Sequence, residues 1–92
     1  MPRFLVEVPH EPESMTCARI VRAFLSSGNH FLTHAEWGCM DGVHSGWIVM
    51  DVDNREQALS ILPAAVRGQA RVVALNNFTI EQMDRVLADH DR

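Results

Sequence analysis

The segment HAEWGCMDGVHSGW, residues 34–47, holds two His, a Glu, a Cys and an Asp together with two Trp. Imidazole, carboxylate and thiol groups are the side chains that transfer protons and bind metal ions in proteins. In the middle of the segment, Asp41-Gly42 is a strong signal for a two-residue hairpin turn. The segment therefore has two interpretations: a catalytic or metal-binding cluster, or a β-hairpin whose alternate side chains are polar.

The catalytic interpretation assigns the chemistry to His34. An unperturbed imidazole has a pKa close to neutrality, so His34 could act as general base or acid, oriented by Glu36 or Glu7. The structural interpretation gives His34 and Glu36 only hydrogen bonds across strands and at a subunit interface. Both interpretations place the same residues on one face of a sheet.

A metal site is a third interpretation. His34 and Glu36 are two residues apart on one face of a strand, and His44 or Asp51 could supply a further ligand. No strong metal-binding spacing such as HExxH occurs in the chain. We therefore assign no metal ligands and expect no cofactor. The two cysteines form no CxxC motif, and we expect both to be free thiols.

Four strands and three helices are predicted from periodicity and capping signals. Apolar residues at every second position indicate strands, and apolar residues three and four apart indicate helices. Asp53 or Asn54 caps the second helix, Pro63 ends or interrupts it, and Thr79 with Gln82 forms a capping box before the third. The predicted strands are 3–8, 31–37, 46–52 and 71–78, and the predicted helices are 14–30, 54–63 and 80–90.

A turn at Asp41-Gly42 fixes which residues of the hairpin are opposite each other. The numbers of opposed residues then sum to 83, and a slip of one residue would exchange the two faces. One face pairs Glu36 with Trp47, His34 with Val49 and Leu32 with Asp51. The other pairs Thr33 with Met50, Ala35 with Ile48 and Phe31 with Val52.

The order of elements, β-α-β-β-α-β followed by a terminal helix, is that of a ferredoxin-like fold. We expect one α+β domain over residues 1–92, with an antiparallel sheet in the strand order 4-1-3-2. Right-handed crossovers place both main helices on the same face of that sheet. The apolar side chains expected beneath the helices are Phe4, Val6, Val8, Phe31, Ala35, Ile48, Met50 and Val52.

The other face of the sheet has no cover within the predicted chain. Its expected residues are Leu5, Glu7, Leu32, His34, Glu36, Trp47, Val49 and Asp51. Apolar patches of this kind usually mark an interface, so we expect a homodimer or a larger homo-oligomer. Within this face we assign catalytic roles to His34, Glu36 and Glu7, and ligand contacts to Trp47, Asp51, Leu32 and Val49.

The run GWIVMDVDNREQALSILPAAVRGQARVVALNNF, residues 46–78, resembles the second half of the dimeric α/β-barrel proteins, in particular the muconolactone isomerase-like members. The shared features are a strand that ends in an acidic residue, a capped helix, a Leu-Pro break and a final strand. The resemblance implies a dimeric α/β barrel with a small-molecule pocket against the sheet, and isomerase-like proton transfer. It transfers no catalytic residue to this chain.

Composition narrows the class of partner. The chain has 12 acidic residues against 8 basic ones, and its formal net charge is -4. All eight basic residues are scattered arginines, so nucleic-acid binding is not expected. With no long apolar run and no secretory signal, we expect no membrane partner and a cytoplasmic location. The predicted function is small-molecule binding or isomerase-like chemistry, and the alternative is a dimeric interaction module without chemistry.

Overall fold

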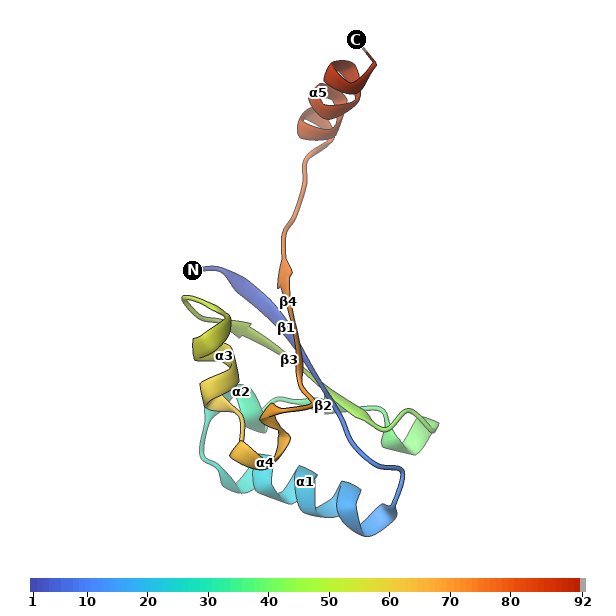
Figure 1. Cartoon of the computed structure of the whole chain (residues 1–92), viewed down its shortest axis with the longest axis vertical. Helices are drawn as coiled ribbons and strands as arrows, with labels where there is room; N and C mark the ends of the chain where they lie inside the picture. Colours follow the sequence, from blue (N-terminus) through green and yellow to red (C-terminus); the bar gives the residue numbers. More distant parts are fainter. Residues whose placement is uncertain (92) are drawn as a thin grey trace.

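A computed structural model describes residues 1–91 of the chain. It shows an α+β fold with one four-stranded antiparallel sheet, compatible with a ferredoxin-like fold (Figure 1). The strands lie side by side in the order β2-β3-β1-β4. The elements are β1 (Arg3–Pro9), α1 (Ser14–Ser26), α2 (His30–Thr33), β2 (Glu36–Trp37), the 3-10 helix η1 (Cys39–Asp41), β3 (Ser45–Asp51), α3 (Arg55–Ile61), α4 (Ala64–Arg67), β4 (Arg71–Leu75) and α5 (Ile80–His90).

The hydrophobic core lies between one face of the sheet and the helices α1 to α4. Alternate residues of β1 and β3 point into it because successive side chains of a strand face opposite sides. Phe24 of α1 and the residues from α3 and α4 complete it, and Phe31 and Ala35 pack against its edge. The buried residues are Phe4, Val6, Val8, Phe24, Leu32, Ile48, Met50, Val52, Ala58, Leu62 and Val66.

The predicted strand over 31–37 is wrong for its first half. Asn29 accepts hydrogen bonds from the backbone N–H groups of Phe31 and Leu32, which starts a turn of helix, α2, at this point. Strand pairing with β3 is limited to Glu36 with Trp47 and Trp37 with Gly46. These two pairs keep the predicted register.

The strand pairs predicted for residues 31–35 do not form. Leu32 in particular turns inward, and its side chain is only 1% exposed. It therefore lies in the core instead of on the open face, where the continuous strand had placed it.

The predicted two-residue turn at 41–42 is a longer loop. Cys39–Asp41 forms a 3-10 turn, and Gly42 follows with a φ of 82°, a conformation that glycine adopts without steric cost. The Gly38 N–H donates to the Ser45 carbonyl and the Val43 N–H to the Gly38 carbonyl, which closes the loop. The hairpin therefore has a folded tip in place of a tight reversal.

The remaining boundaries differ from the prediction mainly at the ends. The helix predicted over 14–30 ends at Ser26, and Glu13 caps its start. Asn54 caps α3 as predicted, and the chain breaks at Pro63 before α4. The strand predicted over 71–78 ends at Leu75.

The terminal helix α5 was predicted correctly, and Thr79 and Gln82 form its capping box. It lies apart from the sheet and the other helices, at the end of an extended segment (Figure 1). The molecule is consequently elongated, with principal extents of 56 × 28 × 21 Å. None of its helices within residues 1–91 has the length and apolar character needed to cross a membrane.

Candidate functional site

The face of the sheet that the helices leave open has its residues in three cross-strand rows. The middle row is apolar: Leu5 of β1 lies between Val73 of β4 and Val49 of β3. Val73 and Val49 are 38% and 48% exposed. The apolar patch expected on this face is therefore present in the chain, although Leu32 does not contribute to it.

Charged rows border the apolar row on both sides. On one side Arg3 of β1 lies between Leu75 and Asp51, and its guanidinium is 3.9 Å from the Asp51 carboxylate. On the other side Arg71, Glu7 and Trp47 are in register, and Arg71 is 3.3 Å from Glu7. Both ion pairs are at the surface, where such pairs contribute little to stability.

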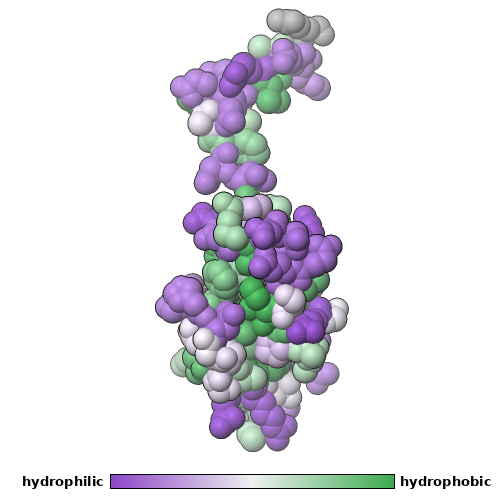
Figure 2. Space-filling model, turned by 90° about the vertical axis from the view of Figure 1, so that its left-hand side faces the viewer, coloured by the Kyte–Doolittle hydropathy of each residue, from purple (hydrophilic) through white to green (hydrophobic). Residues whose placement is uncertain are grey.

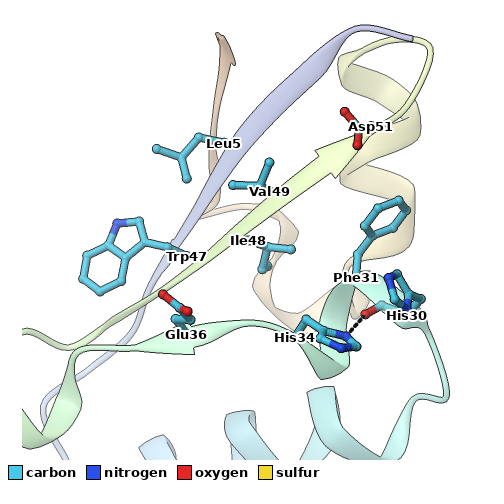
Figure 3. Close-up of a pocket in the computed structure, with 9 residues that line it drawn as sticks. All are labelled: Leu5, His30, Phe31, His34, Glu36, Trp47, Ile48, Val49 and Asp51. Atoms are coloured by element: carbon cyan, nitrogen blue, oxygen red, sulfur yellow. Dashed lines mark hydrogen bonds between the residues drawn. The ribbon is translucent and has the colours of Figure 1, made fainter.

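A groove with a volume of about 440 Å³ lies along the outer edge of β3 (Figure 3). It exists because β2 pairs with only two residues of β3, after which the chain turns away into α2. The apolar residues that line the groove are Leu5, Phe31, Trp47, Ile48 and Val49, and the polar ones are His30, His34, Glu36 and Asp51.

His34 lies at the C-terminal end of α2, and its ring has a defined hydrogen-bond partner. The Nδ1 atom is 2.8 Å from the carbonyl oxygen of His30, four residues earlier. A carbonyl oxygen can only accept, so we assign a proton to Nδ1. Nε2 then carries the lone pair in the neutral ring. Thr33 donates to the same carbonyl oxygen at 3.1 Å, which further fixes this end of α2.

The partner of His34 is a backbone carbonyl and not a carboxylate. No hydrogen bond joins His34 to Glu36 within residues 1–91, although both line the groove. The catalytic interpretation had expected Glu36 or Glu7 to orient the His34 ring. In the structure Glu36 does not set the tautomer of His34. The His30 ring lies beside the His34 ring, tilted by 45° and with 4.5 Å between centroids, so the groove holds a pair of imidazoles.

Glu7, the third predicted catalytic residue, lies outside the groove. It is on the open face, but it is directed to Arg71 and is two strands away from β2. Of the four predicted ligand contacts, Trp47, Val49 and Asp51 line the groove, and Leu32 is buried beneath it. The structure thus brings His34, Glu36, Trp47, Val49 and Asp51 together and leaves Glu7 and Leu32 elsewhere.

Trp47 is held at one end of the groove by the loop that follows β2. A Cβ atom built on Gly38 would lie 2.9 Å from the Trp47 ring, so the indole packs closely on this glycine. On the opposite face Trp37 packs in the same way on Gly46. The two tryptophans therefore clamp the short β2–β3 ladder from both sides.

His30 is exposed, and it lines the groove. Sequence reasoning missed one feature that the fold creates. His10, Cys17, Cys39 and His44, here called the thiol–imidazole cluster, come together near the hairpin tip. The position of Cys39 and His44 on either side of Asp41-Gly42 was visible in the sequence, but nothing in it indicated that His10 and Cys17 would join them.

Comparison with known proteins gives no relative for this chain. No family model, no curated protein and no solved structure matches it.

Proposed function

We propose that this chain is a small-molecule-binding protein that acts as a homodimer of the dimeric α/β-barrel type. The observation that carries the proposal is the groove itself, which His34 and an apolar wall line at the edge of an uncovered sheet. Concave, mostly apolar sites with a few oriented polar groups are typical of ligand pockets.

The groups that line the groove favour a particular class of ligand. Glu36 and Asp51 supply carboxylate acceptors, and Nε2 of His34 supplies a further acceptor. The wall beside them contains Trp47 and Phe31, on which an aromatic or aliphatic ring can pack. We therefore propose a ligand with an apolar ring that carries ammonium or hydroxyl donors. The same Nε2 atom suits proton abstraction from such a ligand, which is the isomerase-like form of the proposal.

The rows on the open face support pairing of two copies. Around a two-fold axis through the middle row, the apolar residues Leu5, Val49 and Val73 of each copy meet each other. The Arg3–Asp51 row of one copy then lies over the Arg71–Glu7 row of the other. Because each row contains both signs of charge, the face is complementary to itself. A second sheet about 10 Å away would also close the groove from above.

The terminal helix supports the same assembly. No residue of α5 is buried, and Ile80, Val86 and Leu87 are 69%, 57% and 60% exposed. Figure 2 shows hydrophobic and hydrophilic surface next to each other on this helix, away from the body. Isolated helices shorter than about 12–15 residues are marginal in water, so this helix of 11 residues needs a surface to pack on. We propose that the second copy supplies it.

A thermal-shift panel of matched ligand pairs tests the binding proposal. Each pair consists of an aromatic amine and the carboxylic acid with the same ring. We expect some amines to raise the melting temperature while the acids, which the groove carboxylates repel, do not. His34→Gln should abolish the shift, and His90→Gln on α5 should leave it unchanged.

The alternative, an interaction module without a ligand, gives a different result in the same panel. If side chains of the second copy fill the groove, no ligand raises the melting temperature of the wild-type protein. A panel without any response would therefore contradict ligand binding and favour the interaction module.

A further inference from the structure

The thiol–imidazole cluster draws four side chains from three separate segments. His10 follows β1, Cys17 is in the first half of α1, and Cys39 and His44 lie on the loop between β2 and β3. One ligand atom each from His10, Cys39 and His44 lies within 4.8 Å of the others. The Sγ atom of Cys39 is 3.2 Å from His10 Nε2 and 2.8 Å from the Sγ atom of Cys17.

Backbone hydrogen bonds hold two of these segments, the end of β1 and the loop between β2 and β3, together independently of the side chains. The N–H of His10 donates to the carbonyl oxygen of His44 at 2.9 Å, which joins the end of β1 to the start of β3. The N–H of Gly42 donates to the carbonyl oxygen of Cys39, which closes the 3-10 turn. The cluster is therefore positioned by the fold before any ligand is present, as a binding site requires.

The imidazoles of the cluster are short of protein partners. The Nδ1 atoms of His10 and His44 are buried, and neither makes a hydrogen bond within residues 1–91. The nitrogen of His10 that lies near Cys39 is Nε2, so the Nδ1 atom of His10 stays without a partner when Nε2 binds an ion. All four residues are half-buried. The Trp37 ring lies beside the His10 ring, with 5.9 Å between the ring centroids.

We propose that His10, Cys17, Cys39 and His44 form a tetrahedral binding site for Zn²⁺. Two thiolates and two imidazoles are a ligand set typical of structural zinc. Binding forms two Zn–S and two Zn–N bonds, and the two thiol protons pass to the solvent. The bound site carries no net charge, because the two thiolates balance the charge of the ion. Four protein ligands leave no open position, so the ion acts as a structural link between the β1–α1 connection and the hairpin tip.

The distance between Cys39 and His10 is close to the one that zinc requires. With Zn–S of about 2.3 Å and Zn–N of about 2.0–2.1 Å, sulfur and nitrogen in a tetrahedral site are about 3.5 Å apart and two sulfurs about 3.8 Å apart. The 3.2 Å between Cys39 and His10 is near the first value. The Cys17 Sγ atom is 2.8 Å from that of Cys39, but it lies outside the group formed by His10, Cys39 and His44, so its side chain must rotate toward the two imidazoles to become the fourth ligand.

The same two sulfur atoms could instead form a disulfide, since both cysteines are free thiols. The experiment must therefore begin from the fully reduced chain. The metal-free, phosphine-reduced protein is titrated with Co²⁺ and monitored by visible and near-ultraviolet absorption, and Zn²⁺ is then added. We expect one equivalent of Co²⁺ to give the d–d bands of tetrahedral cobalt with thiolate charge transfer, and Zn²⁺ to displace it.

Variants assign the ligands. Cys39→Ser should abolish the tetrahedral spectrum, and Cys17→Ser should leave about half of the charge-transfer intensity because one thiolate of two remains. His44→Gln should also weaken Co²⁺ binding, whereas His30→Gln in the groove should not. Circular dichroism of each metal-free variant checks its fold. If a variant fails to fold, the alkylation rates of Cys17 and Cys39 are measured in the wild-type chain with and without Zn²⁺. Zn²⁺ should slow the alkylation of both cysteines.

Several results would overturn the site. These are the absence of a tetrahedral Co²⁺ spectrum in the reduced wild-type chain, a spectrum that survives Cys39→Ser, or equal alkylation rates with and without Zn²⁺. A chain that binds no Co²⁺ and forms a Cys17–Cys39 disulfide once the reductant is removed would identify a redox pair in place of a metal site.

Discussion

Gly46 lies directly beneath the indole ring of Trp37, so close that a Cβ atom at position 46 would be 2.6 Å from the ring. The two residues are opposite each other in the short β2–β3 ladder. Trp37 in turn packs edge-to-face on Phe24 of α1, with 5.0 Å between ring centroids. The absence of a side chain at position 46 therefore fixes the position of a tryptophan that connects the sheet to the helix layer.

Gly46→Ala should lower the free energy of unfolding by about 1–3 kcal/mol, because the methyl group displaces the Trp37 ring from a packed position. Gly68→Ala is the matched control: no atom lies within 4 Å of its added Cβ, and its φ is -67°. The control should be neutral or more stable by up to about 1 kcal/mol. Urea denaturation at one protein concentration measures both, and equal stabilities would contradict the packing described for Trp37.

Leu32→Ala tests the helical conformation of α2. In the core, loss of this side chain should cost about 2–5 kcal/mol. On an open face the same change would cost little, as expected for Leu25→Ala, whose side chain is 58% exposed. If thermal denaturation shows the two variants to be equally stable, Leu32 is outside the core and residues 31–37 form a strand after all.

Val49→Glu tests pairing through the open face. A charge in the middle of the apolar row should raise the dissociation constant of the homodimer at least about tenfold, equivalent to about 1.4 kcal/mol. Val43→Glu is a close control, since Val43 and Val49 are both 48% exposed but Val43 lies on the hairpin loop. Sedimentation velocity over a dilution series gives both constants. A wild-type chain that remains monomeric at high concentration would exclude this interface.

The terminal helix offers a separate test of assembly. Replacing both Ile80 and Leu87 by Gln should weaken the dimer, because the helix loses the apolar side it packs with. Replacing Glu81 and Arg85 by Gln alters only polar positions and should leave the dimer intact. Circular dichroism on dilution should show helix loss as the wild-type dimer dissociates. Full helicity in the monomer would mean that α5 needs no partner.

The fold was predictable where one signal dominated. Alternation in β1 and β3, the Asn54 cap and the Thr79–Gln82 capping box all appear in the structure. The prediction of a strand over 31–37 failed because a short apolar run fits both the strand period and the helical period. The side chain of Asn29 favours a helical turn here.

The candidate site was also predictable only in part. Glu36 faces a common groove with Trp47 because that end of the hairpin keeps its register, and His34 reaches the same groove from the end of α2. The hydrogen bond that orients His34 runs to a carbonyl four residues earlier, and only a helical turn brings that group within reach. The thiol–imidazole cluster depends on contacts across 22 and 29 residues, which no local pattern encodes.

The central claim is that the groove beside His34 binds a ligand through a lone pair on Nε2. The most direct measurement is the ¹⁵N resonance of the histidine rings, recorded while an amine that raises the melting temperature is added. The account predicts that His34 carries its proton on Nδ1 and that its Nε2 resonance shifts with the ligand, while His90 does not change. A proton on Nε2 in the free protein, or a His34 resonance that stays constant at saturating ligand, would contradict it.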